Sequence, residues 1–231
     1  MRFNRKTKPG FDQIHSPHFA VDVCRGVPAE PAIHLDHART KGGAFHLDVE
    51  GAAAKTNCTN TGRGMIDLRG VATDRKFMTT VKTVLGVDLP KSPRTSTSWG
   101  DTKALWLSPD QWLILCPGDK AQALTEQLST ALKSIHHLAV NVSDMRSIIR
   151  VEGDHARTTV MKGTSIDLTH GDYPPGTIRR MKFAEVGALL HIVEVNVIDI
   201  YVFRSYADYA WEFLLKAARK GSEVRLFAKA E

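Results

Sequence analysis

One order of elements occurs twice in this sequence: two strands joined by a tight turn, followed by a helix with one apolar face. The first occurrence spans residues 103–134 and the second spans residues 186–220. The residues of the two segments hardly match, so the repetition is one of structure rather than of sequence. Hairpins and helices in this order predict an α+β protein built from two related units.

The first unit is predicted to span residues 64–143. It begins with a strand at residues 65–69, and the next helix has an apolar face over residues 77–85. Thr73 is expected to cap the start of this helix, and Gly86 is expected to end it. The other expected elements are strands at residues 103–107, 111–115 and 138–142 and a helix at residues 121–135. The resulting order, βαββαβ, is that of the ferredoxin-like split unit.

The second unit is predicted to span residues 146–227. Asp154 is expected to cap a short helix that runs through Met161, and Ser205 with Asp208 resembles a capping box before the last helix. The apolar face of the last helix comprises Ala207, Ala210, Trp211, Leu214, Leu215 and Ala218. The expected strands are residues 147–151, 178–183, 186–193 and 197–203. The fold class is therefore α+β, with two ferredoxin-like α/β units in tandem.

Residues 1–60 differ from the remainder, residues 61–231, which we expect to form the folded domain. The first segment is rich in glycine, proline and histidine and has no sustained apolar period. It is interpreted as an extended N-terminal arm with one short strand at residues 45–49. Such an arm cannot bury enough surface to order itself, so it is either a mobile tail or lies on a neighbouring subunit.

The composition of the 231 residues is that of a globular protein, with 42% hydrophobic and 24% charged residues. No uninterrupted run of apolar residues approaches the length of about 18 that a transmembrane helix needs, so no membrane partner is predicted. The net charge of +6 is spread without a block of like charge, so no nucleic acid partner is indicated. The basic start, residues 1–6, leads into no apolar segment, so no secretory signal is expected.

The three cysteines, Cys24, Cys58 and Cys116, are odd in number and show no CxxC spacing. They are interpreted as reduced thiols in a cytoplasmic protein. Cys116 ends the apolar run at residues 112–116 and is expected to be a small core residue.

Two pairs of histidines near the N-terminus have the i, i+3 spacing that suits a metal site on a helix. The pairs are His15 with His18, and His34 with His37. Neither pair has a cysteine at zinc-finger spacing or lies on a convincing helix. They are interpreted as solvated imidazoles, and metal binding stays open as the alternative, because a metal site normally needs three or four ligands.

Signatures of nucleophilic and nucleotide chemistry are missing: the sequence has no Gly-x-Ser-x-Gly, no P-loop and no Gly-x-Gly-x-x-Gly after a strand. Asp110, in a turn near Trp106 and Trp112, either places a carboxylate beside an aromatic pocket or is an ordinary turn residue. The second interpretation is favoured. Arg204 and Ser205 are interpreted as a strand-end charge and a helix cap. No catalytic, cofactor-binding or metal-binding residue is therefore predicted.

Four parts of the sequence suggest a family. They are IDLRG at residues 66–70 with LGVDLP at 85–90, ALWLSPDQWL at 104–113, Lys162-Gly163 with Asp167-Leu168 and YPPG at 173–176, and YVFRSYADYAW at 201–211. Together, residues 64–221 resemble the gamma subunit of heterotetrameric sarcosine oxidase. That family is similar in fold to the folate-binding aminomethyltransferases, which include the T-protein of the glycine cleavage system.

The resemblance implies a non-catalytic gamma subunit in a complex that demethylates sarcosine oxidatively to glycine. Its partners would be the alpha, beta and delta subunits. Alpha and beta would hold FAD, NAD, covalent FMN and tetrahydrofolate, and delta would hold zinc. The gamma subunit itself would bind no cofactor and would support the assembly and stability of the others.

Two alternatives remain open. The chain could be a stand-alone tetrahydrofolate-dependent protein of the same fold, with a folate pocket near a turn such as the one at Asp110. The related iron–sulfur repair proteins have a reactive cysteine after Lys-Gly, but here Thr164 follows Lys162-Gly163. The chain could also be a gamma-like subunit of an oxidase or dehydrogenase that acts on another N-methyl amino acid.

Overall fold

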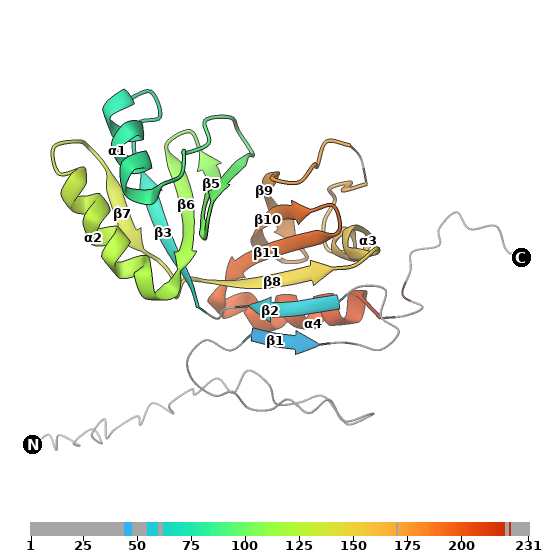
Figure 1. Ribbon diagram of the computed structural model, residues 1–231. Coiled ribbons are helices and arrows are strands. Elements are labelled where there is room, and N and C mark those ends of the chain that lie inside the picture. Colours follow the sequence, from blue (N-terminus) through green and yellow to red (C-terminus); the bar gives the residue numbers. More distant parts are fainter. Residues whose placement is uncertain (1–43, 48–54, 60–61, 170, 220–221, 223–231) are drawn as a thin grey trace, which may run out of the picture. The chain divides into compact units, whose positions relative to one another are not determined.

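The computed structural model describes residues 44–47, 55–59, 62–169, 171–219 and 222. The chain divides into two compact units, residues 1–37 and 38–231, and every described residue belongs to the second unit. No described helix has the length and apolarity needed to span a membrane. Helices and strands alternate in two groups, each built on one antiparallel sheet (Figure 1).

The first sheet has five strands in the order β4-β5-β6-β3-β7, and all neighbouring pairs are antiparallel. Its elements are β3 (Arg63–Arg69), α1 (Arg75–Leu85), β4 (Ser96–Trp99), β5 (Thr102–Ser108), β6 (Gln111–Pro117), α2 (Ala121–Ala131) and β7 (Leu138–Asn141). The predicted βαββαβ order is confirmed for this unit, because β3, β5, β6 and β7 are its four strands. The short edge strand β4 was not predicted.

Helix α1 begins one residue later than its sequence suggested. Asp74, and not Thr73, is the N-cap: its carboxylate accepts hydrogen bonds from the backbone N–H groups of Lys76 and Phe77, at 2.8 and 3.2 Å. Asp74 is itself held in a turn by a 2.9 Å hydrogen bond from its N–H to the carbonyl of Val71, so Thr73 lies inside that turn. Gly86 ends the helix as predicted, with a φ of 73° that favours glycine.

The helices α1 and α2 cover one face of the first sheet with an apolar core. Trp112 at its centre is fully buried, and its indole N–H donates a 2.8 Å hydrogen bond to the carbonyl of Pro90. Cys116 is 3% exposed and belongs to this core, as predicted. The principal residues of the core are Ile66, Leu68, Phe77, Val81, Ala104, Trp112, Ile114, Ala121, Leu128 and Leu132.

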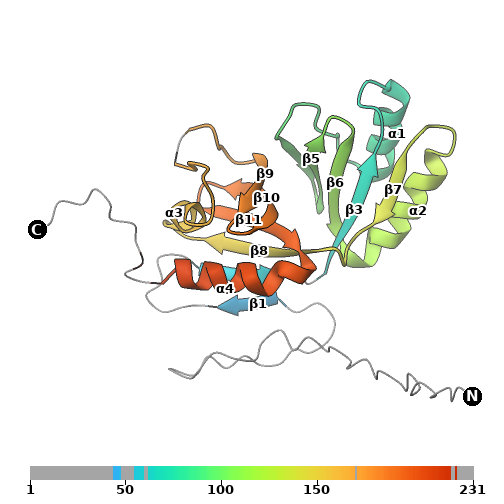
Figure 2. The ribbon, with the colours of Figure 1, turned by 180° about the vertical axis from the view of Figure 1, so that it is seen from behind.

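The second sheet has six strands in the order β1-β2-β8-β11-β10-β9, again antiparallel throughout. Its elements are β1 (Ala44–Leu47), β2 (Lys55–Thr59), β8 (Arg146–Glu152), α3 (Ala156–Met161), β9 (Ile178–Phe183), β10 (Val186–Glu194), β11 (Val197–Phe203) and α4 (Ala207–Ala217). Figure 2 shows α4 lying along this sheet. Two units of the same kind therefore stand in tandem, as predicted.

The second unit obtains one of its strands from far upstream. In the first sheet β7 pairs with β3, the first strand of its unit; in the second sheet β2 occupies the equivalent place beside β8. The pairing runs from Lys55 opposite Glu152 to Cys58 opposite Ile149. A strand was expected near β1, but β2 was not. The other parts of the expected arm, residues 1–43, 48–54 and 60, lie outside the described residues.

Two predicted caps in the second unit are wrong. Asp154 does not cap α3, because its carboxylate accepts a 3.1 Å hydrogen bond from the Asn196 amide, and His155 precedes the helix without a side-chain cap. Ser205 does not cap α4, because it lies in a 3₁₀ turn, Arg204–Tyr206, that leads into the helix. Tyr206 precedes α4 and makes no side-chain capping bond.

The apolar face of α4 packs on the second sheet as expected, with a shift in which residues are buried. Ala210 and Leu214 are fully buried, whereas Trp211 is only partly buried against the same core. Phe213, which the apolar pattern left out, contacts Phe183 edge to face with ring centres 5.3 Å apart. The principal residues of this core are Ile149, Val151, Val160, Phe183, Leu190, Ile192, Ile198, Ile200, Val202 and Leu214.

Candidate functional site

The faces of the two sheets that carry no helices contact each other through a third apolar core. This junction core comprises Met65, Leu105, Leu107, Leu113, Leu115, Ile148, Ile178, Leu189 and Tyr201. Two hydrogen bonds join the sheets nearby: the Ile178 N–H donates to the Arg94 carbonyl at 2.8 Å, and the Ser96 hydroxyl donates to the Gly176 carbonyl at 2.9 Å. The sheets are thus fixed against each other.

Mostly polar side chains continue the junction core at both of its ends, because alternate residues of a strand lie on one face. At one end the positions two residues from a junction-core residue are Arg63, Lys103, Arg150, Asp199 and His191. At the other end the corresponding positions are Asp67, Gln111, Arg146, Arg180 and Phe203. We call the first set the basic end and the second set the Gln111 end.

A buried ion pair lies in the basic end. Arg150 on β8 is directly opposite Asp199 on β11, and its guanidinium donates two hydrogen bonds to that carboxylate, at 2.7 and 3.0 Å. Asp199 is 1% exposed. The hydrogen bonds to Asp199 raise the pKa of Arg150. This bidentate pair satisfies the carboxylate and leaves it no role as an acid or base.

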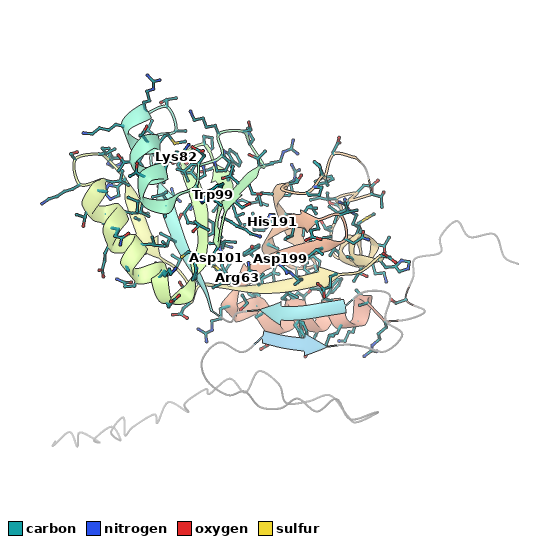
Figure 3. The ribbon with its side chains drawn as sticks, viewed as in Figure 1. Arg63, Lys82, Trp99, Asp101, His191 and Asp199 are labelled. Carbon is teal, nitrogen blue, oxygen red and sulfur yellow. The ribbon has the colours of Figure 1, made fainter. Side chains whose placement is uncertain are left out.

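His191 on β10 lies directly opposite Asp199 and is 4% exposed (Figure 3). Burial, which disfavours the charged imidazolium, lowers the pKa of His191 to about 4, so the ring is neutral at neutral pH. Its Nε2 is 3.4 Å from the Ser96 hydroxyl, and its Nδ1 has no partner among the described atoms.

Ser96, His191 and Asp199 contain the residue types of a hydrolytic triad, but their hydrogen bonds do not form one. The Ser96 hydroxyl donates to the Gly176 carbonyl rather than to the imidazole. The Asp199 carboxylate is bound by Arg150 and does not orient the His191 Nδ1. A triad needs a base that is oriented by the acid and accepts the nucleophile's proton. This arrangement is therefore structural.

A cavity of about 290 Å³, which we call the Lys103 cavity, opens beside the basic end. Its walls are Gly62, Arg63, Gly100, Asp101, Lys103, Leu115, Cys116 and Pro117. Burial and repulsion from Arg63 lower the pKa of Lys103. Cys116 lines this cavity, yet burial raises the pKa of its thiol to about 11, so the thiolate needed of a nucleophile is scarce.

The Gln111 end forms a hydrogen-bonded chain across the two sheets. The Gln111 amide donates to the Asp67 carboxylate at 2.8 and 3.0 Å and accepts from Arg180 at 3.2 Å. Arg146 lies 4.7 Å above the ring of Phe203, in cation–π contact. Burial, with repulsion from Arg180, lowers the pKa of Arg146. These contacts join the two sheets at this end.

The residues considered from the sequence do not come together in one site. Asp110 is exposed in its turn, and the Ser108 hydroxyl donates to it at 2.6 Å, which lowers the pKa of Asp110. Trp106 and Trp112 pack into the helix-covered core, so no aromatic pocket surrounds Asp110. The two histidine pairs lie outside the described residues. In the part of the chain that the structure describes, no three histidine, cysteine or acidic side chains gather as a metal site would require.

The junction clusters were not predicted from sequence, although a signal was present. Asp199 interrupts the apolar strand at residues 197–203, and Arg150 interrupts the apolar run at residues 148–151. Charged residues in such positions are rarely buried without a partner. Two opposite charges in different buried strands therefore could have suggested a cross-strand ion pair.

The fold and its junction define a class of protein: a tandem ferredoxin-like α+β protein whose described polar clusters hold two sheets together. A family model described as the sarcosine oxidase, gamma subunit family matches residues 69–220. The chain belongs to this family. Its role is that of a gamma subunit of the sarcosine oxidase type.

Solved structures share this fold. A chain of the heterotetrameric sarcosine oxidase from Corynebacterium sp. U-96 matches with a TM-score of 0.68 and 21% identity, covering 78% of this chain and 90% of that chain. The glycine cleavage system aminomethyltransferase T from Bartonella henselae matches with a TM-score of 0.52 and 13% identity, covering 78% of this chain and 46% of that chain. No curated protein matches the sequence significantly.

Proposed function

We propose that this chain is a non-catalytic subunit that assembles with the alpha, beta and delta subunits of a sarcosine oxidase complex and stabilises them. The flavins, NAD, tetrahydrofolate and zinc would be held by those partners, and the chain would act in the cytoplasm. The observation that carries the proposal is the junction core. Side chains of both sheets fill the space between the sheets, which gives this interface a structural role. Family membership supports the same role.

A stand-alone folate enzyme is the weaker alternative. The Lys103 cavity holds about 290 Å³, whereas sites for drug-sized ligands occupy about 300–1,000 Å³. Its walls also lack an unpaired buried carboxylate that could act as an acid or base. The cavity is thus at the lower limit of this size range, and the chemistry of its walls argues against a tetrahydrofolate site there.

Exposed aromatic residues supply a surface for assembly. Phe203, Tyr206 and Tyr209 are 42%, 46% and 42% exposed and follow each other at the end of β11 and the start of α4. Aromatic residues are enriched at interface cores, since they bury a large area with few rotatable bonds. We propose that this aromatic patch contacts a flavoprotein subunit of the complex.

Co-purification tests the proposal. The tagged chain, co-expressed with the flavoprotein subunits of a sarcosine oxidase, is expected to co-purify with them and their flavin. Replacing both Tyr206 and Tyr209 by serine should weaken recovery at least tenfold, since interface aromatics often contribute 2 kcal/mol or more, on the order of a thirtyfold change in affinity. Val195→Ser, at a 62% exposed position in the β10–β11 turn, is the matched control. Recovery of no flavoprotein with the unaltered chain would contradict the proposal.

A further inference from the structure

Two cations in the wall of the Lys103 cavity have no partner among the described residues. Arg63 and Lys103 both line the cavity, and neither makes an ion pair or side-chain hydrogen bond with any of the residues that the structure describes. Asp101 also lines the cavity, but it is exposed and not within ion-pair distance of either cation. Buried or half-buried charges are normally paired, so this pair of cations calls for an explanation.

The nearby acids do not neutralise these cations. Five charged groups act on one another here: Arg63 and Arg150 repel Lys103, while Asp199 and Glu194 attract it. Burial and the repulsion from Arg63 are the larger effects, and they lower the pKa of Lys103. Asp199 is already committed to Arg150 by two hydrogen bonds, and Glu194 is exposed. The wall of the cavity is therefore left with uncompensated positive charge.

A second part of the cavity wall, on β6, is apolar, and the rim of the cavity is open. Leu115 and Pro117 form this apolar wall, as the cross-strand neighbours of Lys103 and Arg63. Gly62 and Gly100 stand at the rim with φ of 71° and 54°, and a Cβ atom at either position would meet nothing within 4 Å. A ligand that suits both the cations and the apolar part of the wall has a negative group and a short apolar stem. A fully hydrated phosphate would leave the apolar wall unused.

We propose that the Lys103 cavity binds a carboxylate on a short apolar stem, held by charge-assisted hydrogen bonds from Arg63 and Lys103. The carboxylate comes either from a free short-chain acid or from an aspartate or glutamate side chain of a partner subunit. The second source rests on the proposed function, whereas the first does not. In both cases the guanidinium and the ammonium group are the donors that carboxylates bind best.

Thermal unfolding of the full chain tests the free acid. At constant ionic strength and a propionate concentration ten times its Kd, the midpoint should rise by about 3–6 °C. Equivalent chloride or inorganic phosphate should raise it less. Lys103→Met, which keeps the stem and removes the charge, should abolish the rise, and it should itself raise the ligand-free midpoint by removing the uncompensated cation. Lys133→Met, at an exposed position after α2, should respond like the unaltered chain.

Acylation of the Lys103 amine distinguishes the two sources. A lowered pKa increases the fraction of reactive amine at a given pH, and peptide mass spectrometry reports the rate at which an amine-directed ester modifies Lys103. A rate at least tenfold slower with propionate identifies a free acid. A similar slowing only in the assembled complex identifies a partner's side chain. The proposal is overturned if neither condition protects Lys103, or if phosphate protects it and propionate does not. Such a result would leave the co-purification outcome unaffected.

Discussion

The two sheets complete the same architecture by different routes. The first sheet takes its fourth strand, β7, from the segment that follows α2, whereas the second takes β2 from a segment that precedes the whole first unit. The helix-covered faces are alike and apolar in both. The helix-free faces differ, because the second sheet places Arg150, Asp199 and His191 in its interior. A common fold therefore does not impose a common order of pairing or a common interface chemistry.

The second sheet should consequently be the more fragile of the two. Its closure depends on a strand about 90 residues away in sequence, and closing a longer loop costs more conformational entropy. Its interior also holds an ion pair. An intact buried ion pair contributes little to the free energy of unfolding, but removing one partner lowers that free energy strongly. The expected effects below follow from these two differences, in decreasing size.

Removing one partner of the buried ion pair should have the largest effect. Asp199→Ala leaves the Arg150 guanidinium without its carboxylate, and the free energy of unfolding should fall by about 3–5 kcal/mol. Urea denaturation measures the loss. The double variant Arg150→Met with Asp199→Leu should recover most of it, because apolar groups of similar volume replace the pair. Equal stability of the single and double variants would show that the charge is not the cause.

Interrupting the remote strand should come next. Thr56 lies in β2 between β1 and β8, so Thr56→Pro removes a backbone donor within the sheet. We expect a loss of about 3 kcal/mol or more. Hydrogen exchange should show faster exchange of β8 amides and little change in β3, which belongs to the other sheet. Thr56→Val, which keeps the backbone donor, is the control. Equally faster amide exchange in both sheets would contradict the view that β2 completes only the second sheet.

Acid should weaken the protein through His191. The pKa of this buried imidazole is about 4 in the folded chain and about 6.5 in the unfolded chain, so unfolding takes up a proton between these values. The contribution of neutral His191 to the free energy of unfolding, about 3 kcal/mol, is fully present above about pH 6.5 and is lost as the pH falls toward 4. His191→Gln should flatten this dependence, whereas His136→Gln, at an exposed position, should leave it unchanged. An unaltered slope in His191→Gln would contradict the assignment.

Residues 2–43, which precede β1, should matter least for the fold and most for the complex. We propose that residues 1–60 form an arm that lies on a neighbouring subunit, with β1 and β2 as its anchored part. Deleting residues 2–43 keeps both strands, so the isolated chain should unfold within about 0.5 kcal/mol of the full chain. The assembled complex should lose stability or subunit stoichiometry. A complex of unchanged composition, melting temperature and activity would leave the arm without a partner.

Much of the first unit could be predicted because its elements follow one another along the chain. The apolar period over residues 77–85 and the turn at Asp110 are local signals, and both correspond to observed elements. The strand β2 could not be found in this way, since Lys55–Thr59 is short and its apolar pattern is weak. It becomes a strand only through its pairing with β8.

The candidate site was harder to predict than the fold. Arg63, Lys103 and Asp199 are far apart in sequence and meet only when the two sheets close on each other. Helix caps failed for a related reason: Asp154 and Ser205 were judged from adjacent residues, yet Asn196 binds the first and a 3₁₀ turn contains the second. A distant segment decided the case of Asp154, whereas the path of the chain into α4 decided that of Ser205.

The most direct test of a non-catalytic gamma subunit is sarcosine-dependent formation of peroxide. The purified chain, given sarcosine, oxygen and tetrahydrofolate, should show no flavin absorbance and produce no peroxide above a buffer control. The same chain purified with its flavoprotein partners should accompany a flavin-containing complex that produces peroxide. Turnover or a bound flavin in the isolated chain would contradict the proposed role.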